Sequence, residues 1–340
     1  MDKAILVAVD DSNIVDFEYK IDELKQLMNA CNMEVCATSI QRLNRINSAT
    51  YIGSGKLEEI NVLVDMYNID YVVFMSDLSP AQLKNIVDII DCVVLDRTNL
   101  ILKIFESRAG SREAKLQVEA ANLQYMLPRL IGMRKSLGRQ GGTSGSMSNR
   151  GQGEKQLELD RRHIEKRISE LNKELQSIEH DRNIQRRARL KSNIPSVALV
   201  GYTNAGKSSL MNCLLRRAEL PEEKIVFEKD MLFATLDTSV RKIDTGDNKG
   251  FILSDTVGFV SDLPHTLIKA FRTTLSEAAM ADLLLIILDS SDTHVVEQRE
   301  ITEKTLKEIN CNEVPRLYVY NKCDLSNLPV GIKGLIASAN

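Results

Sequence analysis

The chain has 340 residues, 43% of them hydrophobic and 27% charged, and a formal net charge of -3. This composition is typical of a globular protein with more than one core, and it excludes a chain that is mostly disordered. It also argues against a surface that is basic all over, so any nucleic-acid contact is expected at local patches.

The start of the chain and its longest apolar runs indicate neither a secretory signal nor a membrane span. The runs "AILVAV" and "LLLIIL" are far shorter than the roughly 20 residues that cross a bilayer. Acids at Asp2, Asp10 and Asp11 stand where a secretory signal has a basic start and an apolar middle. We therefore expect a cytoplasmic protein.

Residues 1–107 alternate short apolar runs with amphipathic stretches. Runs such as "AILVAV" and "YVVFM" are separated by helical patterns such as "FEYKIDELKQLMNA" and "KLEEINVLVDMYN". Strand and helix in this rhythm predict an N-terminal parallel α/β domain, the first part of an α/β multidomain protein. Ser79 followed by Pro80 predicts a helix that starts there, with serine as N-cap and proline at the first helical position.

A second stretch in this region has a partial phosphate-loop pattern. "YIGSGK", residues 51–56, lacks the glycine spacing of such a loop and the serine or threonine after its lysine. We interpret it as a tight turn into a helix, with phosphate contact to RNA as the alternative.

Residues 108–192 contain two series of apolar side chains spaced by three and four. Two such seams joined by a connection predict an antiparallel helical hairpin, in which each seam buries the other. Pro128 is expected to end or kink the first helix. The two series are Leu116, Ala120, Leu123, Leu127, Leu130 and Ile164, Ile168, Leu171, Leu175, Ile178.

The connection between these helices, residues 137–155, is rich in glycine, serine and basic side chains. Arg139, Arg150 and Lys155 lie in it, with Glu154 as the nearby acid. One interpretation is a solvated linker, since glycine and serine keep a chain flexible. The other is a basic tip that orders on contact with an RNA phosphate surface. Composition leaves both open.

Residues 193–340 begin with a strand pattern that leads into a phosphate-binding loop. "GYTNAGKS", residues 201–208, fits GxxxxGK[ST] between an apolar strand and a helical pattern. In such a loop, backbone N–H groups surround the β-phosphate, Lys207 bridges the β- and γ-phosphates, and Ser208 binds Mg²⁺. This region is therefore predicted to be a P-loop GTPase domain (G domain).

Three further motifs follow in the order of a guanine-nucleotide site. "FILSDTVG" places Asp255 at a strand end, where it can hold Mg²⁺ through water, and Gly258 next to the γ-phosphate. "RLYVYNKCD" supplies Asn321 and Asp324 to the base. A carboxylate at Asp324 accepts from guanine but not from adenine, which favours GTP over ATP.

Between these motifs, "LFATLDTS" should complete the Mg²⁺ shell through a threonine, with Thr235 chosen and Thr238 in reserve. Near the end, "ASAN" should touch guanine O6. The predicted nucleotide-binding residues are Gly201, Tyr202, Thr203, Asn204, Ala205, Gly206, Lys207, Ser208, Phe233, Ala234, Thr235, Leu236, Asp237, Asp255, Thr256, Val257, Gly258, Asn321, Lys322, Cys323, Asp324, Ser338, Ala339 and Asn340.

These motifs, with long stretches outside them, resemble the HflX family of GTPases, the ribosome-associated branch of the Obg-HflX group. The resemblance covers nearly the whole chain and implies an N-terminal α/β domain, a helical hairpin and a G domain that act together on the large ribosomal subunit. It implies a protein that splits or rescues stalled or idle ribosomes, particularly under stress. The stretches include "YIGSGKLEEI", "DRTNLILKIFESRAGSREAKLQVEAANLQYMLPRL", "RGQGEKQLELDRRHI", "LFATLD", "DTVGFVSDLPHTLIKAFRTTL" and "ADLLLIILD".

The resemblance also bears on the hairpin tip and on the ions. The family's tip loop matches residues 137–155, which favours contact of Arg139, Arg150 and Lys155 with rRNA. Related potassium-activated GTPases use an asparagine at the position of Asn204 to bind K⁺, so K⁺ is a candidate cofactor beside Mg²⁺. We expect a monomer that binds neither DNA nor membrane.

Phe259 occupies the position where many GTPases carry the glutamine that orients water, and the resemblance includes this apolar residue. Intrinsic hydrolysis should therefore be slow, with the ribosome supplying help. Groups supplied by a partner accelerate GTPases by about 10³ to 10⁵.

Two features depart from the family pattern. Thr238 stands where the family has proline after "FATLD", so local rigidity should differ. The sequence ends at Asn340, where a G domain normally adds another helix, so we expect a shortened version or weakened nucleotide binding.

Two other functions stay open. One is a regulatory GTPase switch that binds a protein partner through the hairpin. The other is an ATP-dependent RNA remodeller that uses the N-terminal domain, because some family members hydrolyse ATP and have been linked to RNA unwinding.

Overall fold

The computed structural model describes residues 1–11, 16–139, 147–191, 194–218, 232–233, 236–244, 250–264, 267, 277–325 and 334–337, and it describes no side chains for residues 130–139, 147–157, 183, 185–191 and 336. The chain forms two compact units. The first contains Met1–Ser107 and Val118–Lys173, and the second contains Arg108–Gln117 and Glu174–Asn340. Within the described ranges, no helix is both long and apolar enough to span a membrane.

The first unit contains a four-stranded parallel sheet with the order β2-β1-β3-β4. Helices and strands alternate along the chain, as the sequence predicts. The elements are β1 (Asp2–Asp10), α1 (Phe17–Ala30), β2 (Met33–Arg42), α2 (Ser54–Tyr67), β3 (Tyr71–Phe74), α3 (Pro80–Val87), β4 (Val93–Leu95) and α4 (Arg97–Arg108).

Burial explains the apolar run of β1. Every residue from Ala4 to Val9 is buried, as expected for a central strand of a parallel sheet that is covered on both faces. Helix α1 buries the spaced side chains Ile21, Leu24 and Leu27, which form one face of a helix.

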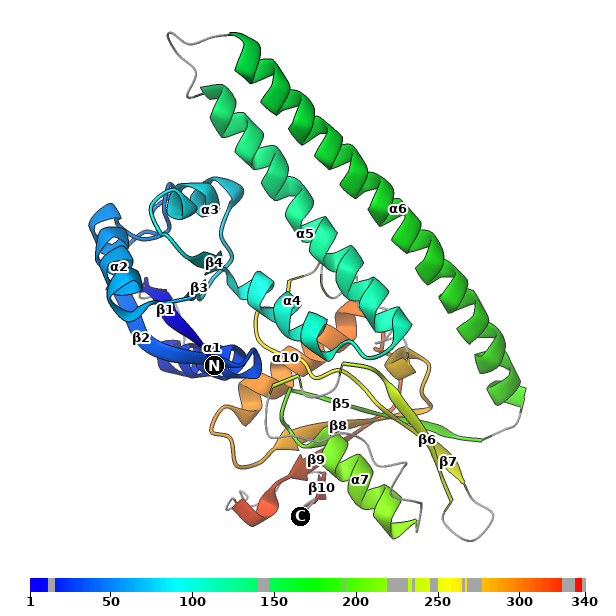
Figure 1. Ribbon diagram of the computed structural model, residues 1–340. Coiled ribbons are helices and arrows are strands. Elements are labelled where there is room, and N and C mark those ends of the chain that lie inside the picture. The colour runs from blue at the N-terminus through cyan, green and yellow to red at the C-terminus, as the bar shows by residue number, and fades with distance from the viewer. Residues whose placement is uncertain are drawn as a thin grey trace. The chain divides into compact units, whose positions relative to one another are not determined.

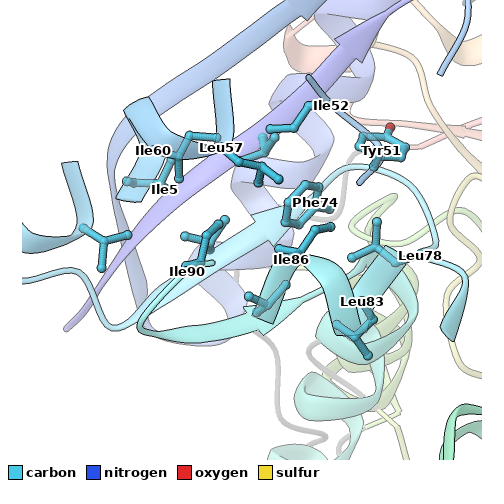
Figure 2. Packing of buried hydrophobic residues seen from close by; sticks show 14 of the residues in the cluster. Ile5, Tyr51, Ile52, Leu57, Ile60, Phe74, Leu78, Leu83, Ile86 and Ile90 are labelled. Atoms are coloured by element: carbon cyan, nitrogen blue, oxygen red, sulfur yellow. The ribbon is translucent and has the colours of Figure 1, made fainter. Parts of the chain in front are cut away.

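One core cluster of this unit surrounds Phe74, which is fully buried (Figure 2). Tyr51 packs its ring edge-on against Phe74, with ring centroids 5.6 Å apart. The Tyr51 hydroxyl reaches Ser76 Oγ at 2.9 Å. Edge-to-face packing of this kind adds to the stability gained from burying the two rings.

Two sequence predictions about helix starts in this unit are confirmed. Gln82 N–H donates to Ser79 Oγ at 3.2 Å and Ser79 N–H donates to Gln82 Oε1 at 2.9 Å, which forms a capping box with Pro80 at the first helical position. Residues 51–56 form a turn into α2, with Gly53 as the N-cap.

Helices α5 (Arg112–Arg139) and α6 (Met147–Lys191) form the predicted hairpin and run antiparallel (Figure 1). Within the first unit, Arg167 donates to Glu119 at 2.7 Å. Both helices continue from one unit into the other. The apolar seam is confirmed at Leu171, which is fully buried in the longer helix.

Pro128 does not end the first helix, because α5 continues through it to Arg139. The kink that the sequence offers as the alternative stays a prediction. A proline removes one backbone donor from a helix interior. The next residue, Arg129, is buried and donates to Tyr125 O at 3.1 Å and to Leu78 O at 3.1 Å. These contacts anchor the helix within the first unit directly after the proline.

The second unit is built on a six-stranded sheet with the order β10-β9-β8-β5-β7-β6, parallel except for the β6 and β7 pair. It confirms the α/β class predicted for the C-terminal region. Its elements are β5 (Ser196–Gly201), α7 (Lys207–Arg217), β6 (Ser239–Ile243), β7 (Phe251–Asp255), β8 (Leu283–Asp289), α10 (Val295–Glu308), β9 (Arg316–Asn321), a 3₁₀ turn (Cys323–Leu325) and β10 (Leu335–Ile336).

This sheet has a core on each face. Alternate residues of β5 divide between the two: Ala198 and Val200 pack in one cluster with Leu306 of α10, while Leu199 packs in the other with Met211 of α7. Side chains of a strand point to opposite faces in turn. The sheet is therefore buried on both faces, and its strand ends are left to carry the site.

Candidate nucleotide-binding site

The predicted phosphate loop leaves the carboxyl end of β5, a central strand of the second sheet. Strand β5 pairs with β8 on one side and with β7 on the other. The chain connections diverge at such a point, and the carboxyl ends of the strands around it are where open α/β sheets bind ligands. Residues 201–206 form this loop, and α7 begins at Lys207.

Gly206 and Asn204 give the loop its curvature. Both have positive φ, 90° and 60° respectively, a region that favours glycine and that asparagine tolerates better than most residues. A Cβ on Gly206 would lie 2.1 Å from Asn321 Nδ2. The positive φ and the nearby Asn321 side chain together favour glycine at this position.

The Lys207 side chain is held in place by the loop itself. Its ammonium group is buried and donates to Gly201 O at 3.2 Å and to Tyr202 O at 2.7 Å. Burial lowers the pKa of Lys207 to about 8, and the carboxylate of Asp255 opposes that shift. A phosphate anion would favour the charged form further, so the site is prepared for a ligand of opposite charge.

The two predicted magnesium residues of known position face each other. Ser208 Oγ donates to Asp255 Oδ2 at 2.6 Å. Burial raises the pKa of the Asp255 carboxyl group, while Lys207, Ser208 and the Thr256 N–H lower it. Asp255 Oδ1 is buried with no hydrogen-bond partner among the described residues.

This pair of residues fits Mg²⁺. Mg²⁺ takes oxygen ligands and usually keeps several of its waters, and a buried carboxylate oxygen without a partner is costly unless something satisfies it. A hydrated cation would satisfy Asp255 Oδ1. When bound with a nucleotide, it neutralises charge on the phosphates.

The segment around Gly258 and Phe259 is bonded to the phosphate loop through backbone atoms. Thr203 N–H donates to Phe259 O at 2.6 Å and Phe259 N–H donates to Gly201 O at 3.1 Å. A Cβ on Gly258 would lie 2.6 Å from Thr203 Cα, so a larger residue would push the two segments apart. This segment is thus tied closely to the loop.

The Phe259 ring does not face the phosphate side. It is only 2% exposed and packs in the core cluster with Ala198, Val200 and Leu284. The sequence predicts that this position offers no polar group to water. The structure adds that the ring anchors the segment to the core.

The neighbouring polar residues are also engaged in the fold. Thr256 Oγ1 donates to Leu199 O at 2.7 Å, and Val257 is buried. Ser261 N–H donates to the Tyr202 hydroxyl at 2.8 Å. The side chain of one loop residue thus holds the segment that follows Phe259.

The segment that contains the predicted magnesium threonine is described only in part. Ala234 and Thr235 lie outside the described residues, and Thr238 is half-buried. Phe233 and Leu236 are buried, and Phe233 N–H donates to Thr203 Oγ1 at 2.8 Å. This segment, too, is held by a side chain of the phosphate loop.

Asp237, which the sequence assigns to the nucleotide, contacts the start of α5 in this structure. Its carboxylate accepts from Gly110 N–H at 2.9 Å, from Ser111 N–H at 3.1 Å and from the Ser111 hydroxyl. We call this set of bonds the Asp237–Ser111 contact. The sequence does not predict it, although Ser111 has the residue type of an N-cap.

The residues predicted to contact the base lie at the end of β9 and directly after it. Asn321 is 1% exposed, and its Nδ2 donates to Ala205 O at 3.0 Å, so it joins this strand to the phosphate loop. Lys322 Nζ lies 2.6 Å from Asp289 Oδ2. Cys323 is half-buried and Asp324 is exposed, which leaves the Asp324 carboxylate accessible to a base.

The remaining predicted site residues have no described side chains. Ser338, Ala339 and Asn340 lie outside the described residues. For Arg139, Arg150 and Lys155 the structure describes a helical backbone only, so their contact with rRNA stays a prediction.

Comparisons with known proteins agree with this site. A GTP-binding GTPase N-terminal model matches residues 18–106, a GTP-binding GTPase middle-region model matches residues 108–189, and a 50S ribosome-binding GTPase model matches residues 196–322.

Among curated relatives, the chain is 45% identical over 324 residues to a GTPase HflX of Caldanaerobacter subterraneus subsp. tengcongensis, covering 95% of this chain and 73% of that protein. It is 40% identical over 324 residues to the GTPase HflX of Escherichia coli K12, covering 95% of this chain and 74% of that one. A crystal structure of a GTP-binding protein from Sulfolobus solfataricus in complex with GDP has a TM-score of 0.53 and 26% identity, covering 100% of this chain and 93% of that one.

Proposed function

Because this chain belongs to the HflX family of GTPases and hydrolyses GTP, we propose that it binds the large ribosomal subunit and splits or rescues stalled or idle ribosomes. The model that matches residues 196–322 is described as a 50S ribosome-binding GTPase, which supports the choice of partner. The protein acts in the cytoplasm as a monomer, partly bound to ribosomes.

The burial of Phe259 carries this proposal. With its ring in the core and its backbone bonded to the phosphate loop, the residue contributes no polar group that could orient water. Hydrolysis in the free protein is therefore slow. The ribosome supplies the missing help, either by ordering the segments around the γ-phosphate or by contributing groups to it.

Ions complete the proposed site. Mg²⁺ binds at Ser208 and Asp255, with Thr235 joining when the γ-phosphate is present. K⁺ binds near Asn204, whose backbone is held in the left-handed region at φ 60°. Equal GTPase rates in potassium and sodium buffers would remove the K⁺ site from the proposal.

The first experiment measures GTP hydrolysis with and without purified large ribosomal subunits. We expect stimulation on the order of 10³-fold, the range that partner-supplied groups give. Co-sedimentation with the subunits should be stronger with a non-hydrolysable GTP analogue than with GDP. No stimulation, with equal sedimentation in both states, would overturn the proposal.

A Lys207→Met variant serves as the control for the enzyme. It should lose GTP turnover, because the buried ammonium group is the cation of the phosphate loop. If this variant kept its ATP turnover, ATP would be hydrolysed elsewhere in the chain. That result would favour the ATP-dependent RNA remodeller over the proposed function.

A second experiment tests the hairpin tip. Reversing the charge at Arg150 and Lys155 should weaken ribosome binding and flatten its salt dependence, since each phosphate contact adds to that slope. The control is Lys166→Glu, an exposed charge change on the same helix. If ribosome binding changed neither with salt concentration nor in any of these variants, a protein partner would be favoured.

A further inference from the structure

We propose that Asp237 is a positioning residue that couples the nucleotide state to the first turn of the hairpin, through the Asp237–Ser111 contact. This inference deepens the proposed function, because it names the residue through which GTP would change how the hairpin presents itself to a ribosome. The coupling itself requires only that the protein binds guanine nucleotides.

On the side of the hairpin, the contact includes the N-cap residue of helix α5. Ala114 N–H donates to Ser111 Oγ at 3.1 Å, so Ser111 is the N-cap of the helix. The hydroxyl hydrogen of the same serine is committed to Asp237. The carboxylate thereby reaches the helix through its capping residue, where a negative charge is also favoured by the helix dipole.

On the other side, Asp237 lies a short distance along the chain from the phosphate loop. Phe233, four residues earlier, donates its N–H to Thr203 Oγ1 of that loop at 2.8 Å. Four residues can extend over at most roughly 14 Å. A change in the loop that moves Phe233 can therefore be passed to Asp237 along a short stretch of chain.

Two described residues beside Asp237 are anchored in the fold. Phe233 and Leu236 are each 2% exposed. Asp237 itself is half-buried. Its carboxylate accepts hydrogen bonds from backbone N–H and hydroxyl groups, and no cation pairs with it in the part of the chain that the structure describes. Such bonds can be exchanged for bonds to water at modest cost.

Gly110 makes the contact sensitive to packing. A Cβ on this residue would lie 3.0 Å from Asp237 Oδ2, closer than side chains normally approach. The carboxylate would have to give way by a few tenths of an ångström. Gly110→Ala therefore perturbs the contact from the helix side without changing any residue of the nucleotide site.

The test measures hydrogen exchange of the full chain loaded with GDP or with a non-hydrolysable GTP analogue. The reporters are the amides of Gly110 and Ser111, which donate to Asp237. In the native protein we expect their exchange rates to differ between the two nucleotides. In Asp237→Ala both amides should exchange roughly tenfold faster, and the difference between nucleotides should disappear.

Ser111→Ala and Gly110→Ala test the coupling from the other partner. Both should reduce the nucleotide-dependent difference while leaving affinity for GDP and for the GTP analogue unchanged. Effects of Ser111→Ala and Asp237→Ala on that difference should be non-additive, since both remove one contact. Glu300→Ala, at an exposed acid of α10 in the same unit, is the matched control and should change none of these rates.

Two results would overturn the proposal. One is a nucleotide-dependent difference that survives in Asp237→Ala. The other is a loss of nucleotide binding in Asp237→Ala with the difference intact in Ser111→Ala, which would assign the carboxylate to the ligand. Because the exchange assay contains no ribosome, it does not depend on the proposed function. If the exchange difference is found but the protein fails to sediment with large subunits, the proposed function fails and the coupling through Asp237 stands.

Discussion

Two aspartates contact helix α5, and they do so in opposite ways. In the first unit, Asp96 is fully buried and accepts hydrogen bonds from Leu78 N–H, Asn99 N–H and the Tyr125 hydroxyl, with Arg129 as its cation. In the second unit, Asp237 is half-buried and accepts only from neutral groups at the start of the helix.

The two carboxylates differ in the free-energy cost of breaking their contacts with the helix. Removing one partner of a buried ion pair leaves an uncompensated charge away from water. A half-buried carboxylate that leaves neutral donors regains water as a partner. Asp96 therefore makes a permanent attachment of the helix, and Asp237 makes one that a nucleotide can shift.

The largest effect is expected from breaking the permanent attachment. Arg129→Ala should lower the free energy of unfolding of the first unit by about 3–5 kcal/mol, because Asp96 stays buried without its cation. Urea denaturation followed by circular dichroism measures the loss. The contact between Arg129 and Asp96 is 2.7 Å long, with both side chains under a tenth exposed.

The control for Arg129→Ala is Arg42→Ala in the same unit. Arg42 pairs with Asp10 at 3.2 Å, but its side chain is 89% exposed. Surface pairs of this kind contribute about 0–1 kcal/mol. Equal losses in the two variants would show that burial is not what makes the Asp96 attachment strong.

Tyr125→Phe removes a neutral donor from Asp96 and keeps the cation. Burial and the nearby Asp96 carboxylate raise the pKa of Tyr125, so its hydroxyl is a donor at neutral pH. We expect a loss of about 1–2 kcal/mol, typical of one hydrogen bond to a charged group. The same urea experiment measures it, and a loss as large as that of Arg129→Ala would contradict the central place given to the cation.

Asp237→Ala should lower the free energy of unfolding by less than Arg129→Ala does. Loss of an acceptor at a helix N-terminus costs about 1 kcal/mol, here in the second unit. Thermal unfolding of the nucleotide-free protein measures it, with Glu300→Ala as the control expected within about 0.5 kcal/mol of the native protein. A loss near that of Arg129→Ala would place Asp237 among the permanent attachments.

The contrast between the two aspartates also marks the limit of what the sequence predicts. Alternating apolar runs predict both sheets, and the spacing of Ser79, Pro80 and Gln82 predicts a helix start, because these signals depend on neighbours along the chain. The motif around Lys207 predicts the phosphate loop for the same reason. Local rules are enough for these features.

Contacts between distant residues escape those rules. Asp237 and Ser111 are 126 positions apart, and neither residue type indicates the other. Pro128 shows a related limit. The local rule predicts a helix end or a kink there, and the helix continues past the proline to contacts of Arg129 with Leu78 and Asp96, which lie far away in the sequence. The burial of the Phe259 ring likewise depends on strands that lie elsewhere in the chain.

The smallest effect is expected at Asp77, a second acid beside Asp96. Its carboxylate accepts from Thr98 N–H at 3.2 Å and from Thr98 Oγ1 at 2.6 Å, bonds that an asparagine oxygen can also accept. Burial raises the pKa of Asp77, and the Asp96 charge adds to the shift, while Thr98 and Arg129 oppose it.

A carboxyl group whose pKa is higher in the folded state binds its proton more tightly there, so its ionisation at neutral pH destabilises the fold. Asp77 is exposed, so solvent screens much of this effect. Asp77→Asn should therefore be neutral or stabilising by only about 0.5 kcal/mol or less at pH 7.5. The gain should shrink as the pH is lowered through the raised pKa, because the native carboxyl group then becomes neutral as well. Urea denaturation at pH 7.5 and pH 5 measures both; a loss of stability at pH 7.5 would mean that Asp77, like Asp96, is needed as a charge.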